Sequence, residues 1–210
     1  MLTTEEQLLM DLHSVTVIYK KGEIICKQGA LASHIIYMEK GLAKVFLEDG
    51  VNSLVLKIIP DGNMLGLSSV NKDNVTYQYS AMAYIDSEIK QINLSFFNQM
   101  LGQNPGFARE VINIFGANSV QINGRFFCLT HKQSYGRLAD IIICLADRIF
   151  KNHEFELPLS RKELAELSGM SSETVIRMLK KFNDEGLIHL KGKYFKILDK
   201  SRLRKISETG

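Results

Sequence analysis

Two residues of opposite charge, Glu173 and Arg177, stand four positions apart in the segment "SSETVIRMLKKF". An arginine can donate two hydrogen bonds to the O6 and N7 atoms of guanine, and a glutamate can accept one from the amino group of cytosine. On a helix this spacing places both side chains on one face. The same pair could instead be an ordinary ion pair that stabilises an isolated helix by about 0.3 kcal/mol.

The residues around this pair predict two short helices joined by a tight turn. Ser160 and Glu163 form a capping box, so a helix is expected from about Arg161, and Gly169 can end it in a left-handed conformation. Ser171 caps the next helix, whose buried face is predicted to hold Val175, Met178, Leu179 and Phe182. Two such helices make a helix-turn-helix, and "LIHLKGKYFKI" predicts a two-stranded wing that turns at Lys191-Gly192-Lys193.

The second helix of such a motif enters the major groove of double-stranded DNA. Its predicted base contacts are Ser172, Glu173, Ile176 and Arg177. Its predicted phosphate contacts are Ser160, Arg161, Ser171, Thr174, Lys180 and Lys181. Residues 131–210 hold 16 Lys and Arg against 11 Asp and Glu, whereas residues 1–130 hold 10 against 12. The basic C-terminal half therefore fits a nucleic-acid partner.

The composition of the 210 residues, 45% hydrophobic and 23% charged, is typical of a globular protein. The acidic start "MLTTEEQLLMDLH" and the lack of a long apolar run favour a cytoplasmic protein with no membrane partner. Cys26, Cys128 and Cys144 are widely spaced, which predicts neither a disulfide framework nor a metal cluster. We expect no cofactor, and the identity of any effector stays open.

Before about Leu94 the chain consists of short apolar or alternating runs separated by glycines. This pattern is typical of an antiparallel barrel, sandwich or jelly roll. After "NPGF" the apolar period changes to a heptad seam, which predicts a helix over about 106–130. The seam residues, expected at a homodimer interface, are Ile112, Phe115, Ser119, Ile122, Phe126 and Leu129, although packing of the helix on its own domain would give the same stripe.

The combined patterns predict an α+β fold with an N-terminal jelly roll, a long dimerisation helix and a C-terminal winged helix-turn-helix. We place the domain boundary near 131–136, which gives a sensor domain over 1–130 and a DNA-binding domain over 137–210.

With these motifs the sequence resembles the CRP/FNR family of bacterial transcription regulators over nearly its whole length. "SRKELAELSGMSSETVIRMLKKFNDEGLI" is similar to the family's helix-turn-helix, and "GEIICKQGALASHIIYMEKGLAKVF" to its cyclic-nucleotide-binding-type β-roll. The resemblance implies a two-fold dimer on a palindromic operator, with RNA polymerase as a further partner. It also implies that Glu173 and Arg177 read a TGA-type half-site, while Ser172 replaces an arginine of the cyclic-AMP-responsive member.

The resemblance also locates an effector pocket, whose candidate residues are Leu65, Gly66, Leu67, Tyr77, Gln78, Ile122 and Asn123. In the family a Gly-Glu cassette binds the ribose, and an Arg-Ser pair binds the cyclic phosphate. Here Leu67 replaces the glutamate, and we place the Arg-Ser positions at Tyr77 and Gln78. A buried phosphate without a matching cation is costly, so control by cyclic AMP is not expected. The alternative is a cyclic-nucleotide-responsive regulator with a non-standard pocket.

Other functions are less well supported by the residues. An enzyme on a jelly roll would need several metal ligands on facing strands, and the five histidines are scattered. A haem sensor could use His13 or His34, and an apolar effector could occupy the cradle around Leu67 and Tyr79. A protein-binding adaptor with a helix-turn-helix would lack any DNA sequence preference.

Overall fold

The computed structural model describes residues 2–50 and 53–210, and the chain forms two compact units, residues 1–122 and 123–210. The division falls inside the longest helix, α3 (Pro105–His131). It lies about two turns before the boundary at 131–136 that the sequence suggests. The polar break at Lys132-Gln133 does end the helix, but the helix changes its packing partners earlier, where no sequence signal marks the change.

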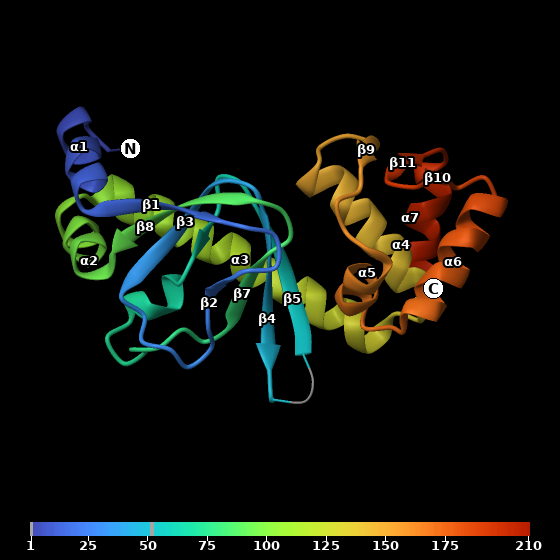
Figure 1. Cartoon of the computed structure of the whole chain (residues 1–210), viewed down its shortest axis with the longest axis horizontal. Helices are drawn as coiled ribbons and strands as arrows, with labels where there is room; N and C mark the ends of the chain where they lie inside the picture. The colour runs from blue at the N-terminus through green and yellow to red at the C-terminus, as the bar shows by residue number, and fades with distance from the viewer. Residues whose placement is uncertain (1, 51–52) are drawn as a thin grey trace. The chain divides into compact units, whose positions relative to one another are not determined.

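The first unit contains two four-stranded antiparallel sheets (Figure 1). One sheet has the strand order β1-β8-β3-β6, formed by Ser14–Tyr19, Ser87–Asn93, His34–Lys40 and Met64–Leu65. The other has the order β2-β7-β4-β5, formed by Ile24–Cys26, Ser80–Ala83, Leu42–Glu48 and Ser53–Pro60. Sequence neighbours such as β3 and β4 lie in different sheets, which is the connectivity of a roll.

The interior of the roll is filled by apolar residues from both sheets. Ile36, Met38 and Ile89 of the first sheet belong to one buried cluster with Ala43 and Val45 of the second. Strand β3 pairs with β8 through Ile35↔Ile92 and Met38↔Ile89. Only one face of each strand reaches this cluster, because successive side chains of a strand point to opposite faces of the sheet.

A second cluster joins the roll to three helices of the same unit. It includes Met10 of α1 (Thr4–Leu12), Phe97 of α2 (Leu94–Gln103), and Phe107 and Val111 of α3. Helices α1 and α2 were not predicted from the sequence, although both have local caps. Thr3 forms a capping box with Glu6, and Asn93 caps α2.

The second unit packs helices against a small three-stranded sheet (Figure 1). Its elements are α4 (Ser134–Cys144), a π-helical turn (Leu145–Ile149), β9 (Glu154–Glu156), α5 (Arg161–Ser168), α6 (Ser172–Asp184), β10 (Ile188–Lys191), β11 (Tyr194–Ile197) and α7 (Lys200–Thr209). The predicted fold class, a β-roll followed by a long helix and a winged helix-turn-helix, is confirmed. Strand β9 and helix α7 were not predicted. Within the described ranges, no helix combines the length and apolar character needed to cross a bilayer.

Candidate DNA-binding face and effector cradle

The caps predicted at the helix-turn-helix form in the structure. The Ser160 hydroxyl accepts a hydrogen bond from the Glu163 backbone N–H at 3.2 Å, and the Glu163 carboxylate accepts one from the Ser160 N–H at 2.6 Å. Helix α5 ends at Gly169, whose φ of +61° is left-handed. The residue at which α5 begins and the residue at which it ends are therefore both determined by local contacts. Since only a short turn follows, these contacts also help to determine where α6 begins, at Ser172.

Helix α6 has one buried face and one exposed face. Val175, Leu179 and Phe182 are buried in the domain. Glu173, Ile176 and Arg177 are exposed on the other side of the helix, and Ser172 is partly exposed. The four candidate base contacts therefore lie along the outer side of the first two turns, which is the part of a recognition helix that meets base edges.

The predicted phosphate contacts divide into helix caps and long cations. The Ser171 hydroxyl accepts from the Thr174 N–H at 3.2 Å and donates to the Thr174 hydroxyl at 2.9 Å. Ser160 and Ser171 thus serve first as caps, at helix ends whose remaining N–H groups favour an anion. Lys180 is exposed beside Arg177, close to the base-contacting face.

Lys181 and Arg161 have partners within the domain. The Lys181 ammonium lies 4.6 Å from the ring centroid of Tyr135 and 3.7 Å from the Glu185 carboxylate. Lys181 is therefore on the flank of α6. The Arg161 guanidinium donates to the Gly192 carbonyl at 3.4 Å, and burial lowers the pKa of Arg161. This contact joins the start of α5 to the tip of the wing.

A groove of about 260 Å³ runs between α6 and the wing. Its lining residues are Arg161, Ile176, Leu179, Lys180, Asn183, Leu190 and Gly192. Its floor is apolar and its rim is cationic, and it borders the exposed face of α6. The cations at its edge are of the type that contacts the phosphates of a nucleic acid.

The wing is a tight hairpin, as the sequence predicts. Lys191 pairs with Tyr194, so that Gly192 and Lys193 form a two-residue turn, and Gly192 has a φ of +63°. The third strand, β9, pairs with β11 through Phe155↔Phe195. Lys191 and Lys193 are both exposed at this end of the hairpin.

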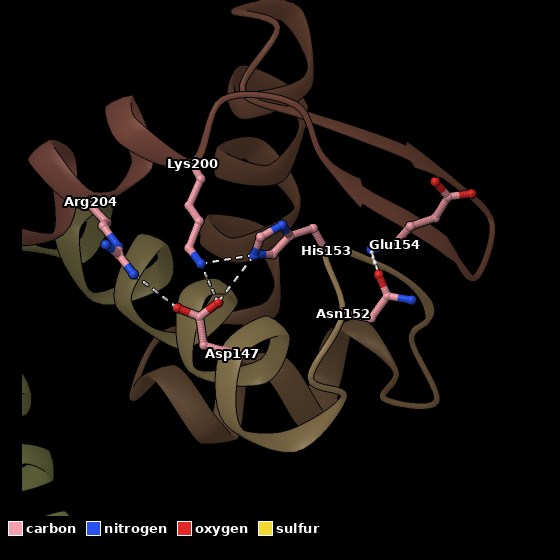
Figure 2. A network of polar contacts seen from close by, with 6 residues as sticks. All are labelled: Asp147, Asn152, His153, Glu154, Lys200 and Arg204. Atoms are coloured by element: carbon pink, nitrogen blue, oxygen red, sulfur yellow. Dashed lines mark hydrogen bonds and ion pairs between the residues drawn. The ribbon is translucent and has the colours of Figure 1, made fainter.

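A network of ion pairs holds the base of this wing (Figure 2). Asp147 of the π-helical turn accepts from Lys200 at 2.6 Å and from Arg204 at 3.3 Å, both on α7. His153, just before β9, lies 3.4 Å from the same carboxylate. Although burial opposes ionisation of Asp147, the hydrogen bonds from Lys200 and Arg204 hold its pKa below the usual value. The network therefore ties α7 to the residues that start β9.

The end of α3 contacts the turn of the helix-turn-helix. The Arg125 guanidinium donates to the Leu167 carbonyl near the end of α5, and a Leu129 methyl group lies beside Gly169. Arg125 was missed in the sequence because a partly buried arginine inside a heptad pattern looks like a surface residue. Leu129, which was predicted at the dimer seam, is only partly exposed. Part of its side chain packs against the turn at Gly169 in its own unit.

The other seam residues lie on the exposed side of α3. Ile112, Phe115, Ile122 and Phe126 are between 42% and 68% exposed, and Ser119 is exposed as well. The residues one position earlier in each heptad are those that pack on the first unit, including Phe107, Val111 and Ile114. Packing of α3 on its own domain therefore does not account for the seam.

The predicted effector cradle is filled by residues of the roll itself. Leu65 and Tyr77 are buried in the interior cluster, and Leu67 is buried in the second cluster. The Gly66 N–H donates to the Tyr79 hydroxyl at 2.7 Å. Tyr77 donates to the His34 carbonyl at 2.8 Å, and its ring lies 3.1 Å from the point that a Cβ on Gly66 would occupy. Burial raises the pKa of both tyrosines to about 12.

The other three residues of the predicted cradle are exposed. Gln78 is exposed, and its amide donates to the Thr76 carbonyl at 3.0 Å, because side chains alternate as the chain enters β7. Tyr79 is the residue that reaches Gly66, so its role was missed. Ile122 and Asn123 are exposed on α3. The part of these three residues in an effector pocket stays a prediction.

The buried serine that follows Tyr79 is also engaged within the chain. The Ser80 hydroxyl donates to the Glu48 carboxylate at 2.5 Å and accepts from the Gln28 N–H at 3.0 Å. Lys27 forms a 2.8 Å ion pair with the same carboxylate, and these bonds lower the pKa of Glu48. Among the described residues, no three His, Cys, Asp or Glu side chains are grouped so as to hold a metal ion.

Two family profiles match the chain, one in each unit. A Crp-like helix-turn-helix domain matches residues 136–206, and a cyclic nucleotide-binding domain matches residues 16–104. Transcriptional activator protein FnrA of Stutzerimonas stutzeri is 26% identical over 185 residues, which are 86% of this chain and 75% of that protein. The cAMP-activated global transcriptional regulator CRP of Salmonella typhimurium is 23% identical over 179 residues, 83% and 85% of the two chains.

A solved structure gives the same fold over nearly the whole chain. FixK2 from Bradyrhizobium japonicum superposes with a TM-score of 0.85 at 19% identity, covering 94% of this chain and 98% of that one. The family to which both profiles and these relatives point consists of transcription regulators rather than enzymes. The chain thus belongs to the CRP/FNR family of transcription regulators and carries that family's helix-turn-helix DNA-binding domain.

Proposed function

We propose that this protein is a homodimeric regulator that binds a palindromic operator and does not respond to cyclic AMP. The observation that carries the proposal is the exposed face of α6, where Glu173 and Arg177 stand side by side while the opposite face is buried. A guanidinium and a carboxylate in this arrangement can discriminate base pairs by about 1–3 kcal/mol each. Such a regulator acts in the bacterial cytoplasm.

The dimer is supported by the exposed seam of α3. Several large apolar side chains repeat at heptad spacing on a helix whose other side already packs on the β-roll. Exposed apolar stripes of this kind are the usual mark of an interface. A two-fold pair of chains presents two recognition helices in opposite directions, and this symmetry matches a palindrome. RNA polymerase is the proposed further partner, by family resemblance.

Independence from cyclic AMP is supported by the filled cradle. The Tyr79 hydroxyl accepts the hydrogen bond from the Gly66 N–H, so this donor is not available to a ligand. The Leu67 side chain is buried in the second cluster. A nucleotide would have to displace these groups and would meet no arginine at the positions of Tyr77 and Gln78. Desolvating its phosphate there would cost several kcal/mol.

The proposal is tested by selecting operators from a library of palindromic duplexes and measuring their affinity in gel shifts at several salt concentrations. We expect one preferred half-site and an affinity that falls as salt rises. Equal binding to all duplexes would instead indicate an adaptor or a non-specific DNA-binding protein. Titration calorimetry with cyclic AMP and cyclic GMP should give no heat of binding, and micromolar affinity would favour the alternative of a non-standard nucleotide pocket.

A further inference from the structure

Ile176 is the apolar residue within the exposed polar face of α6. Its side chain is 53% exposed, although Glu173 lies one turn before it, Lys180 one turn after it and Arg177 beside it. Its β-branched side chain has one strongly preferred rotamer on a helix. The helix therefore holds a rigid apolar group at the surface that faces DNA.

The side chain also has a defined direction. Ile176 lines the groove between α6 and the wing, together with Leu179 and Leu190. It thus stands between the polar side chains of Glu173 and Arg177 and the apolar floor of the groove. A base that touches Ile176 would lie on the wing side of the base pairs that Glu173 and Arg177 contact.

The major groove offers one apolar group to such a side chain. Guanine, adenine and cytosine present hydrogen-bonding atoms there, whereas thymine also presents its 5-methyl group. An isoleucine packed against the amino group of cytosine or adenine would leave a donor without a partner, which is unfavourable. If the isoleucine packs against a thymine methyl group, the apolar surfaces of the side chain and of the methyl group are both buried.

We infer that Ile176 is a specificity-determining residue that recognises the 5-methyl group of a thymine in each half-site, next to the base pairs contacted by Glu173 and Arg177. This inference rests on the proposed function, since it requires that α6 enters the major groove. It adds the chemical feature that fixes one further position of the operator.

The inference is tested by replacing each thymine of one half-site of the selected operator, in turn, with uracil. This change removes only the methyl group and keeps every hydrogen-bonding atom. At one position the affinity of the wild-type protein should fall about fourfold, which is the effect of one buried methyl group. The Ile176→Ala variant should bind the thymine and uracil duplexes equally, and Ile176→Val should keep most of the difference.

Two results would overturn the inference while leaving the proposed function intact. In the first, the operator is still selected but no uracil replacement weakens the wild-type protein. In the second, uracil weakens wild type and Ile176→Ala by the same factor, so that the methyl group acts through DNA shape or another residue. A wild-type protein without any operator preference would overturn both the inference and the proposed function. Because Ile176 is exposed, its variants should fold, and their thermal unfolding provides the check.

Discussion

The Cδ2 atom of Leu129 lies 3.2 Å from the point that a Cβ atom would occupy on Gly169. Leu129 is near the end of α3, and Gly169 lies in the turn between α5 and α6, the two helices of the helix-turn-helix. The last turn of the long helix thus closes over the turn of the helix-turn-helix, and Arg125 reinforces this contact by donating to the Leu167 carbonyl. These side chains therefore support the turn that precedes α6.

The first prediction concerns Gly169. Gly169→Ala must hold a left-handed φ of +61° and also crowd Leu129, so we expect a loss of about 2 kcal/mol in the free energy of unfolding. Gly186→Ala is the matched control, because Gly186 has a φ of +69° and nothing within 4 Å of its Cβ position. It should lose only about 1 kcal/mol. Urea unfolding at a fixed protein concentration measures both, and equal losses would show that Leu129 yields without cost.

The second prediction separates base contacts from phosphate contacts on α6. Arg177→Ala should relax discrimination at one guanine position, at a cost of about 1–3 kcal/mol on the selected operator alone. Lys180→Ala should weaken binding to all duplexes alike and reduce the salt slope by about one. Gel shifts over a range of salt concentrations distinguish the two patterns. Uniform losses from Arg177→Ala would reassign that side chain to a phosphate.

The third prediction tests the dimer seam. Phe115→Glu places a carboxylate at the centre of the exposed stripe, and we expect the dimer dissociation constant to rise at least about 100-fold, as for other central interface residues. Asn113→Glu adds the same charge to an exposed position of α3 outside the seam and should leave the dimer unchanged. Sedimentation equilibrium gives both constants. If the two variants dimerise alike, the chains associate through another surface.

The fourth prediction concerns Lys57, a buried lysine of β5 whose ammonium donates to the Asn118 side chain of α3 at 2.7 Å. Burial lowers the pKa of Lys57 to about 8 from its usual 10.5. Between these two values the folded protein has lost the proton that the unfolded chain still binds. The stability of the wild-type protein should therefore rise with pH across this window, as the penalty for burying the charge disappears.

Lys57→Met removes this titration and serves as the comparison. We expect Lys57→Met to be more stable than wild type at pH 7, and we expect the difference to narrow from about pH 8 to 10.5. Thermal unfolding at a series of pH values measures the difference. A constant difference across this range would mean that the lysine keeps its ordinary pKa in the folded protein.

The parts of the structure that depend on near neighbours in the chain could be predicted from the sequence. The Ser160 capping box, the Gly169 turn and the hairpin at Gly192 each involve residues within a few positions of one another, so their geometry is contained in a short motif. The heptad seam is similar, because the period of a single helix decides which side chains share a face.

The parts that depend on distant contacts could not be predicted. Tyr79 reaches the N–H of Gly66 only because the segment before β7 and the turn after β6 meet in the roll, whereas counting along the chain pointed to Gln78. Arg125 donates to the Leu167 carbonyl, and the two residues are 42 positions apart in the chain. Helix α7 was missed because it is rich in charged residues, and its stability depends on contacts such as the ion pair from Lys200 to Asp147.

Helix α3 carries two apolar stripes that differ by one residue in phase. Phe107, Val111 and Ile114 face the β-roll, and Ile112, Phe115 and Ile122 follow the other face. Inserting a single residue would rotate everything beyond it by about 100° and turn both stripes away from the surfaces they serve, whereas inserting seven would rotate it by only about 20°. Insertions or deletions in this helix should therefore be tolerated best at lengths close to a whole number of turns, such as seven residues.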